Sequence, residues 1–128
     1  MYKRQDEVVQ EVDNLVVTAG KNYVADRMKN NSTVMSHMAI GTGTSAAGAS
    51  DTTLGSEAAR TALTSATVST NTIVYVDTFA AGTGTGAITE AGVFNASSGG
   101  TMLCRTVFSV VNKGADDSMT ITWTITVS

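Results

Sequence analysis

MTITWTITV, residues 119–127, has the strongest strand pattern in the chain. Apolar residues alternate with threonine along the stretch, and in a β-strand such alternation separates the two kinds of side chain onto opposite faces. The apolar face would carry Met119, Ile121, Trp123, Ile125 and Val127. We therefore expect a strand at about Ser118–Val127 that packs on a core through this face and turns its threonines outward.

Earlier parts of the chain have similar patterns, and turn-forming residues separate most of them. We expect five further strands, at about Val34–Ile40, Arg60–Val68, Thr72–Phe79, Ala87–Asn95 and Met102–Asn112. Glycine, asparagine, serine and aspartate occupy the breaks between the later strands, as hairpin turns require. The pattern predicts a mainly β fold, built as a single antiparallel β-sandwich.

A helix is expected before the first of these strands, at about residues 18–30. Thr18 can cap its start, and Arg27 and Lys29 lie near its end, where positive charge is favourable. We assign residues 18–128 to the β-sandwich domain, including this helix, and residues 1–17 to an N-terminal arm.

The arm is consistent with two local structures. Helical spacing relates Val8, Val12, Leu15 and Val16. In contrast, the run Leu15–Val17 is rich in β-branched residues, which favour extended backbone. A helix and an extended segment are therefore both expected possibilities for this part of the chain.

The composition favours contact with other proteins. Of the 128 residues, 42% are hydrophobic and only 15% are charged, whereas charged residues make up about 25% of typical soluble domains. Threonine, serine, glycine and alanine must then cover much of the surface, which suits protein–protein contact. The length corresponds to one domain.

Charge and hydropathy argue against several other classes of protein. A net charge of −3 and an isoelectric point near 4.9 provide no basic face for nucleic acid. The sequence has no apolar run of about 18 residues that could span a membrane, and its charged N-terminus does not fit a secretory leader. Cys104 is the single cysteine, which excludes an intrachain disulfide and a cysteine-rich metal site.

GTSAAGAS, residues 43–50, nearly matches a phosphate-binding P-loop. Gly43 and Gly48 have the required spacing and Ser50 closes the pattern, but Ala49 occupies the position of the lysine. Small polar residues follow, so we expect a loop here in place of a phosphate-binding helix. GTGTG, residues 82–86, lacks the spacing of a dinucleotide-binding motif and is expected to be a hairpin loop.

Few residues could support catalysis. His37 lies within an expected strand and has no visible partner, and Cys104 has no histidine near it in the sequence. The pair Asp116–Asp117 lacks the spacing of an EF-hand and fits a hairpin turn. We expect no catalytic residue, no cofactor and no metal site.

Four charged residues interrupt strands that are otherwise apolar or small: Glu57, Arg60, Glu90 and Arg105. Burying an arginine is costly unless it is paired. We therefore expect structural ion pairs or contacts with the backbone, with Arg60 and Glu90 as the first candidates. The substitution Arg60→Ala should then lower the melting temperature by several degrees, and an unchanged melting temperature would contradict this role.

Three stretches together resemble small structural proteins of tailed bacteriophages. They are MAIGTGT at residues 38–44, LGSEAAR at 54–60 and ITEAGVFN at 88–95. The start of the expected helix at Thr18–Lys21 and Trp123 in the last strand fit the same pattern, so the resemblance covers about residues 15–128. The order and spacing of the pieces carry it, since each piece alone is weak.

This resemblance implies a jelly-roll-like β-sandwich and a non-enzymatic role in a virion assembled in the host cytoplasm. A capsid decoration (cement) protein, which bridges capsid subunits, is the first expectation, and a tail, baseplate or fibre-attachment component is the alternative. The partners would be the major capsid protein or other virion proteins, and further copies of this chain in a dimer or trimer. A carbohydrate-binding module is a more distant alternative, because sugar binding is common among β-sandwiches.

Partner contacts are expected in three places, namely the N-terminal arm, the loop at residues 41–55 and the loop at residues 82–86. The residues assigned to these contacts are Val8, Val12, Gly41, Gly43, Gly48, Gly82, Gly84 and Gly86.

Overall fold

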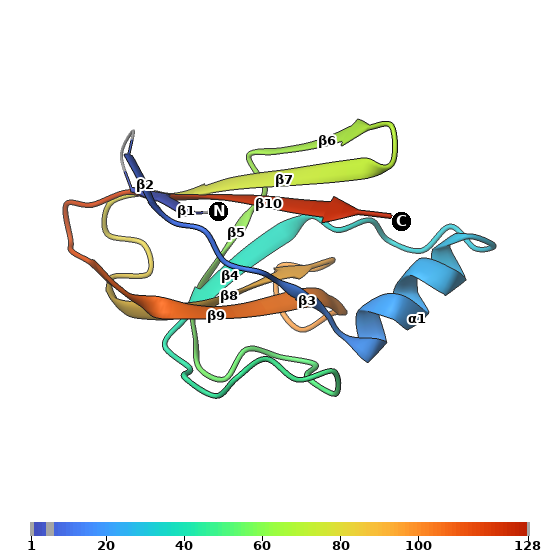
Figure 1. Cartoon of the computed structure of the whole chain (residues 1–128), viewed down its shortest axis with the longest axis horizontal. Helices are drawn as coiled ribbons and strands as arrows, with labels where there is room; N and C mark the ends of the chain where they lie inside the picture. The colour runs from blue at the N-terminus through green and yellow to red at the C-terminus, as the bar shows by residue number, and fades with distance from the viewer. Residues whose placement is uncertain (1, 5–6, 128) are drawn as a thin grey trace.

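Figure 1 shows the computed structural model of the chain, which describes residues 2–4 and 7–127, with side chains from residue 11 onward. The elements, in chain order, are β1 (Tyr2–Arg4), β2 (Glu7–Gln10), β3 (Leu15–Val16), α1 (Thr18–Arg27), β4 (His37–Gly41), β5 (Glu57–Ala62), β6 (Ser65–Ser69), β7 (Thr72–Phe79), β8 (Gly86–Phe94), β9 (Met102–Lys113) and β10 (Met119–Thr126). The described part of the chain is therefore mainly β with one helix, as predicted.

The strands form two antiparallel sheets of five strands each. The first sheet has the order β2-β1-β10-β7-β6 and the second has the order β3-β9-β8-β4-β5. In Figure 1 the first sheet lies above the second, and one core cluster takes side chains from both. The first sheet contributes Tyr75, Phe79 and Trp123, among others, and the second contributes Met38, Val93 and Phe108. This arrangement is compatible with the expected β-sandwich.

The stretch that dominates the sequence forms β10 in the middle of the first sheet. Met119, Ile121 and Trp123 are buried in the core, while Val127 lies beyond the strand and is 70% exposed. The strand predicted at Thr72–Phe79 is confirmed to the residue as β7, which pairs with β10 along its whole length. On the outer face, the hydroxyls of Thr78 and Thr120 are 2.9 Å apart across the two strands, a cross-strand contact that stabilises this pair.

The predicted single strand Arg60–Val68 is wrong, because it is two strands in different sheets. β5 pairs with β4 in the second sheet, and β6 pairs with β7 in the first. The chain crosses between the sheets at Leu63, whose amide donates to Ser36 O, and Thr64, whose amide donates to Val76 O. Leu63 packs against the core during this crossing, so the apolar pattern continues although the strand does not.

Two further boundaries differ from the sequence prediction. The strand predicted from Val34 begins at His37, and Val34 itself is 53% exposed. The helix ends at Arg27, and its N-cap is Val17, with no side-chain cap. Thr18 is instead the first helical residue, and its amide donates to Ala49 O at 2.8 Å. A main-chain carbonyl from a distant loop thus takes the place of the expected side-chain cap.

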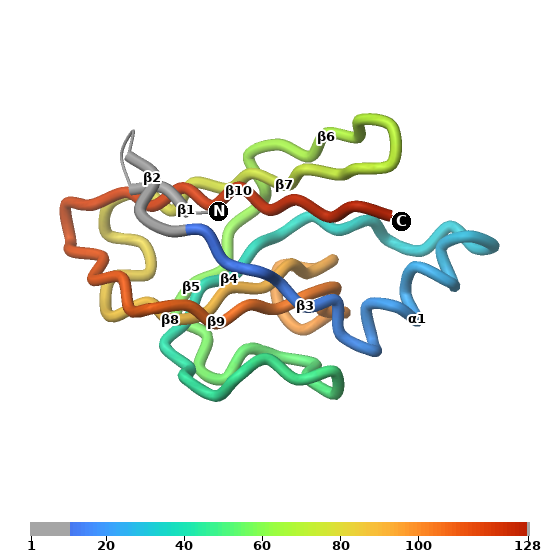
Figure 2. Tube along the Cα trace, in the orientation of Figure 1, coloured from blue at the N-terminus to red at the C-terminus, as the bar shows by residue number. Residues whose placement is uncertain are grey.

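The N-terminal segment is extended, so the helical alternative for residues 8–16 is wrong. β1 pairs with β10 and with β2, which places both strands at one end of the first sheet. β3 pairs with β9 at the edge of the second sheet. Figure 2 shows residues 11–17 crossing from the level of β10 to that of β9. The segment therefore joins the two sheets along one side.

Candidate functional site

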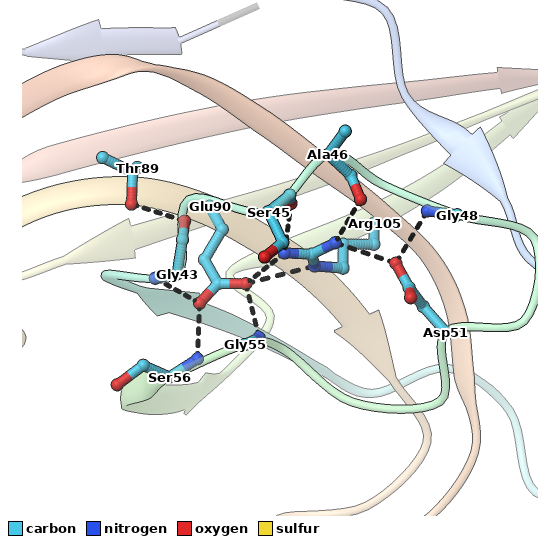
Figure 3. Close-up of polar contacts among 10 residues, drawn as sticks. All are labelled: Gly43, Ser45, Ala46, Gly48, Asp51, Gly55, Ser56, Thr89, Glu90 and Arg105. Carbon is cyan, nitrogen blue, oxygen red and sulfur yellow. Dashed lines mark hydrogen bonds and ion pairs between the residues drawn. The ribbon is translucent and has the colours of Figure 1, made fainter.

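The largest group of buried polar contacts lies at one end of the second sheet. It consists of Glu90 on β8, Arg105 on β9 and Asp51 in the loop between β4 and β5 (Figure 3). We call these three residues the loop clamp. The register pairs Arg105 with Gly92, so Glu90 and Arg105 are diagonal neighbours on one face of the sheet, within reach of long side chains.

The carboxylate of Glu90 is fully buried and accepts hydrogen bonds at both oxygens. Oε2 accepts the amides of Gly43 and Ser56, each at 2.7 Å. Oε1 accepts the amide of Gly55 at 2.7 Å and two donations from Arg105, through Nε at 3.1 Å and Nη2 at 3.0 Å. No part of this carboxylate is left without a donor.

Arg105 connects the same carboxylate to the other side of the loop. Its Nη1 donates to Asp51 Oδ2 at 2.8 Å, and its Nη2 donates to Ser45 O at 3.0 Å. Asp51 Oδ2 in turn accepts the amide of Gly48 at 2.8 Å. The side chain of Arg105 is only 3% exposed, so the guanidinium is paired on every side that faces the protein.

The surroundings of Glu90 favour its charged form. Burial alone would raise the pKa of Glu90, but the amides of Ser56, Gly55 and Gly43, together with Arg105, outweigh burial and hold the pKa below its usual value. The pKa of Asp51 is also lowered, mainly by the amide of Gly48, with Arg105 adding to the effect against burial. The clamp is therefore a buried ion pair whose hydrogen bonds are satisfied, the condition under which such pairs are tolerated.

This geometry explains the first glycine, Gly43, of the pattern that resembles a P-loop. A side chain at Gly43 would place its Cβ 2.4 Å from Glu90 Oε2 and 2.9 Å from the Cα of Gly55. Only glycine at position 43 lets the two ends of the loop lie so close to the carboxylate and to each other. Backbone amides that a P-loop would turn toward a phosphate are here turned toward an internal carboxylate.

Arg60 and Glu57 form a second, separate cluster. Arg60 Nη2 contacts Glu57 Oε1 at 2.7 Å, and Nη1 donates to Ala96 O at 3.0 Å and Gly99 O at 2.8 Å. The guanidinium also stacks on the ring of Phe94, 3.7 Å from its centroid. Arg60 thus holds the turn between β8 and β9, and the four charged residues selected from the sequence lie in two clusters.

The predicted contact residues have different positions in the structure. Gly41 is buried, and a Cβ there would lie 2.3 Å from Ser56 O, while Gly43 contacts Glu90. Gly48 lies at the outer end of the same loop, near Asp51. Gly82, Gly84 and Gly86 lie at and before the start of β8, with φ angles of 84°, 67° and 144°. Val12 packs against the core, and the side chain of Val8 lies outside the described residues.

Three charged residues with internal hydrogen-bond partners were not selected from the sequence, and two of them, Asp77 and Lys113, are buried. Besides Asp51, they are Asp77 on β7, which accepts a short hydrogen bond from Thr61 of the other sheet, and Lys113, whose Nζ donates to Ala80 O and Asp117 O, each at 2.8 Å. A single aspartate or lysine beside turn residues gives no sequence signal of burial. For Asp77, the signal was its place within an otherwise apolar strand.

The residues considered for chemistry have structural partners. His37 Nδ1 lies 2.7 Å from Ser36 Oγ, and Cys104 is buried, which raises the pKa of its thiol. Asp117 accepts the amide of Gly114 through Oδ2 at 2.9 Å, as in a turn. Within the described residues, no three metal-binding side chains are close enough to hold an ion, and no helix is both long and apolar enough to cross a bilayer.

The chain matches no protein-family model, no curated protein and no solved structure.

Proposed function

We propose that this chain is a non-enzymatic structural protein of a tailed-bacteriophage virion, and that it acts as a capsid decoration protein bridging capsid subunits. The proposal includes the jelly-roll-like form of the β-sandwich that the resemblance implies. The two five-stranded antiparallel sheets are compatible with a β-sandwich.

The observation that carries the proposal is the convergence of the three stretches behind the resemblance. Residues 38–44 form β4 and the start of the loop, residues 54–60 contain the end of the loop and part of β5, and residues 88–95 contain most of β8. Glu90 of the third stretch accepts the amides of Gly43 from the first and of Gly55 from the second. The three stretches are therefore joined by hydrogen bonds to one buried carboxylate, which supports a structural role for the residues behind the resemblance.

The clamp gives the loop at residues 42–56 a fixed shape on the outside of the second sheet. Several of its residues, including Thr42, Thr44, Ser45 and Thr52, are exposed, while its backbone is held from within by Glu90 and Arg105. A loop ordered before binding loses little conformational entropy when it meets a partner. Uncharged hydroxyl and small side chains also cost less to desolvate at a protein contact than charged side chains do. This loop is therefore the proposed surface for a capsid subunit.

The proposed self-association would use β6. It is an edge strand of the first sheet, and all five of its residues, Ser65–Ser69, are exposed. An uncharged edge without proline leaves its amides and carbonyls open to pairing. Pairing β6 with β6 of a second copy brings no like charges together, whereas β5, an edge strand of the second sheet, carries Glu57 and Arg60. The second copy of this chain is thus the partner that β6 fits.

A decoration protein stabilises a capsid because it binds the assembled shell and not the separated subunits. Repeated copies turn a modest contact into a large total effect. A tail, baseplate or fibre-attachment component would use the same loop and edge on a different part of the virion. A carbohydrate-binding module is less favoured, because the strand aromatics that could stack on a sugar are buried: Tyr75, Phe79, Phe94, Phe108 and Trp123.

The test is a virion assembled without this protein, examined by negative-stain electron microscopy and by retention of packaged DNA. The decoration role predicts intact tails and heads that leak DNA or break on heating, and addition of the purified chain should restore them. Bare or incomplete tails with stable heads would favour the tail component. Normal particles in every respect, together with specific binding on a glycan array, would overturn both.

A further inference from the structure

β6 is the least covered strand of the first sheet. It lies at the end of that sheet beyond β7 (Figure 1), all five of its residues are exposed, and within the described residues no strand pairs with its outer edge. Its register places Ala66 opposite Tyr75 and Val68 opposite Ile73, so Ala66 and Val68 belong to the core-facing side of the sheet. Val68 is nevertheless 71% exposed. The second sheet therefore does not cover this end of the first.

The main-chain groups that β6 turns toward its open edge follow from the pairing inside the sheet. Val127 N donates to Asn71 O at 2.8 Å, one position beyond the last paired residues of β10 and β7. Hydrogen-bonded pairs alternate along antiparallel strands, so the odd-numbered residues of β7 bond to β10 and the even-numbered ones to β6. The partners of the even-numbered residues are Ser65, Thr67 and Ser69. Ala66 and Val68 therefore direct their N–H and C=O groups outward.

We infer that two copies of this chain pair through antiparallel β6 strands about a two-fold axis at Thr67. This inference rests on the self-association proposed above and adds its register and symmetry. With Thr67 opposite Thr67 of the second copy, Ala66 of each chain is opposite Val68 of the other, and the outward N–H and C=O groups of both residues are paired. The axis is perpendicular to the sheet, so the two first sheets join into one continuous sheet with their core-facing sides together.

The neighbouring registers leave outward groups unpaired. An axis at Ala66 would place Val68 opposite Thr64 of the second copy. The Thr64 amide already donates to Val76 O at 2.8 Å, so it is not available. An axis at Val68 would place Ala66 opposite Thr70, which has a left-handed φ of 57° in the turn before β7 and is not extended. The inferred axis is the register in which every outward group of Ala66 and Val68 has a partner.

The side chains also match in this register. On the outer face, Thr67 is opposite Thr67 of the second copy at a pair without main-chain hydrogen bonds, where side chains are closest. Thr78 and Thr120 form a pair of the same kind inside the first sheet, and their hydroxyls are 2.9 Å apart. At the ends of the strand, Ser65 is opposite Ser69. Hydroxyl residues therefore face hydroxyl residues on one side of the sheet, and apolar residues face apolar residues on the other.

The test is disulfide crosslinking of cysteine variants. Residues in a pair like that of Thr67 have Cα atoms about 4.5 Å apart, within the range of about 4.4 to 6.8 Å that a disulfide spans. Thr67→Cys should therefore convert most of the protein to a covalent dimer under mild oxidation, seen by non-reducing electrophoresis. The matched control is Ser69→Cys on the same exposed face, because Ser69 would lie about 13 Å along the strand from Ser69 of the second copy. Cys104 is buried and is the single native cysteine.

A mixture of the Ser65→Cys and Ser69→Cys variants should form a mixed disulfide, whereas neither variant should crosslink alone. Crosslinking of Ala66→Cys or Val68→Cys alone, without crosslinking of Thr67→Cys, would overturn the inferred axis and leave pairing through β6 in place. If no variant crosslinks above the Ser69→Cys control, the inference is overturned, and sedimentation then shows whether the chain associates through another surface. The virion role is tested separately by particle assembly and DNA retention.

Discussion

Glu90 and Arg105 depend on each other, because either one alone would be a buried charge without its main partner. The substitution Glu90→Gln keeps the shape of the side chain but removes the charge that Arg105 faces at 3.0 Å. We expect it to lower the free energy of unfolding by about 3 to 5 kcal/mol, measured by urea denaturation.

The matched control is Glu57→Gln, which removes the carboxylate of an ion pair whose acidic side chain is 34% exposed. It should cost less than about 1 kcal/mol. The double substitution Glu90→Gln with Arg105→Met should be less destabilising than the sum of the two single changes, since it leaves no unpaired charge. Additive effects would show that the two side chains do not act as a unit.

Asp77 should make the stability of the protein fall as pH rises through the weakly acidic range. Burial raises the pKa of Asp77 to about 6 from a usual value of 3.8, although hydrogen bonds from Thr61, Thr78 and Thr64 oppose the shift. Between these two values the unfolded chain releases a proton that the folded chain retains, so the unfolded state gains stability as pH rises. The change is up to about 3 kcal/mol, and it is complete above pH about 6.

The substitution Asp77→Asn tests this directly. The difference in unfolding free energy between variant and wild type should shift in favour of the variant by about 2 to 3 kcal/mol from pH 4 to pH 7.5. Glu90 and Asp51, whose pKa values are lowered, lose stability as pH falls, but this contribution is common to both proteins and cancels. A difference that stays constant over this range would contradict the prediction.

Charged residues within apolar strands could be identified from the sequence, but the residues with which they pair could not. Glu57, Arg60, Glu90 and Arg105 stood out because they interrupt apolar strands. Which acid meets which base depends on the register of β8 with β9 and on the path of the loop, and neither is encoded locally. Asp51 was missed for the same reason, since its partner Arg105 is separated from it by 54 residues.

Among the elements, α1 is attached to the second sheet by a contact that requires glycine. A Cβ added at Gly20 would lie 2.0 Å from the main-chain oxygen of Leu103 and 2.8 Å from its carbonyl carbon. A flexible side chain could move away from the added Cβ, but the main chain of β9 is held by its strand pairing and cannot. Gly20→Ala should therefore destabilise the protein by at least about 2 kcal/mol, although alanine normally favours a helix by about 1 kcal/mol.

Gly48→Ala is the control, because the nearest atom to its added Cβ is Asp51 Oδ1 at 3.7 Å. It should change the free energy of unfolding by less than about 1 kcal/mol. Both variants can be compared by thermal and urea denaturation followed by far-ultraviolet circular dichroism. A Gly20→Ala protein as stable as the wild type would show that α1 does not pack on β9 as described.

Strands with a regular alternation of apolar and polar residues could be predicted from the sequence. The point where the chain leaves one sheet and enters the other could not. β7 and β10 each have one buried and one outward face along their length, so the alternation located them well. β5 and β6 lie in different sheets, yet Leu63 between them is apolar and packs on the core. The apolar pattern therefore continues through Leu63, although one strand ends there and the next begins in the other sheet.

We expect copies of this chain to associate with one another through β6. Val68 on β6 is 71% exposed, on the edge proposed to pair with a second copy. Lysine on an edge strand discourages such pairing, so Val68→Lys should shift the sedimentation of the protein from a dimer or higher oligomer toward the monomer. The control Val110→Lys places the same charge on β9, at a position that is 54% exposed but inside the second sheet.

Both variants should retain the melting temperature of the wild type, which separates loss of association from loss of folding. If the two variants and the wild type sediment alike, β6 is not the contact between copies. The presence of two antiparallel sheets and one helix could be read from the sequence. The assignment of strands to each sheet could not, because it depends on pairings between distant parts of the chain.

The pairing of the first strands with the last has a consequence for how the protein is made. Residues 2–4 of β1 are synthesised before their partner β10, and β3 before its partner β9, so neither strand can complete its pairing until those later strands have been synthesised. A nascent chain that stops before residue 119 would leave the β1 and β7 edges bare and lack Trp123. Folding of both sheets is therefore completed only after β10 has been synthesised, and a product that lacks β10 would expose unpaired strand edges to proteolysis.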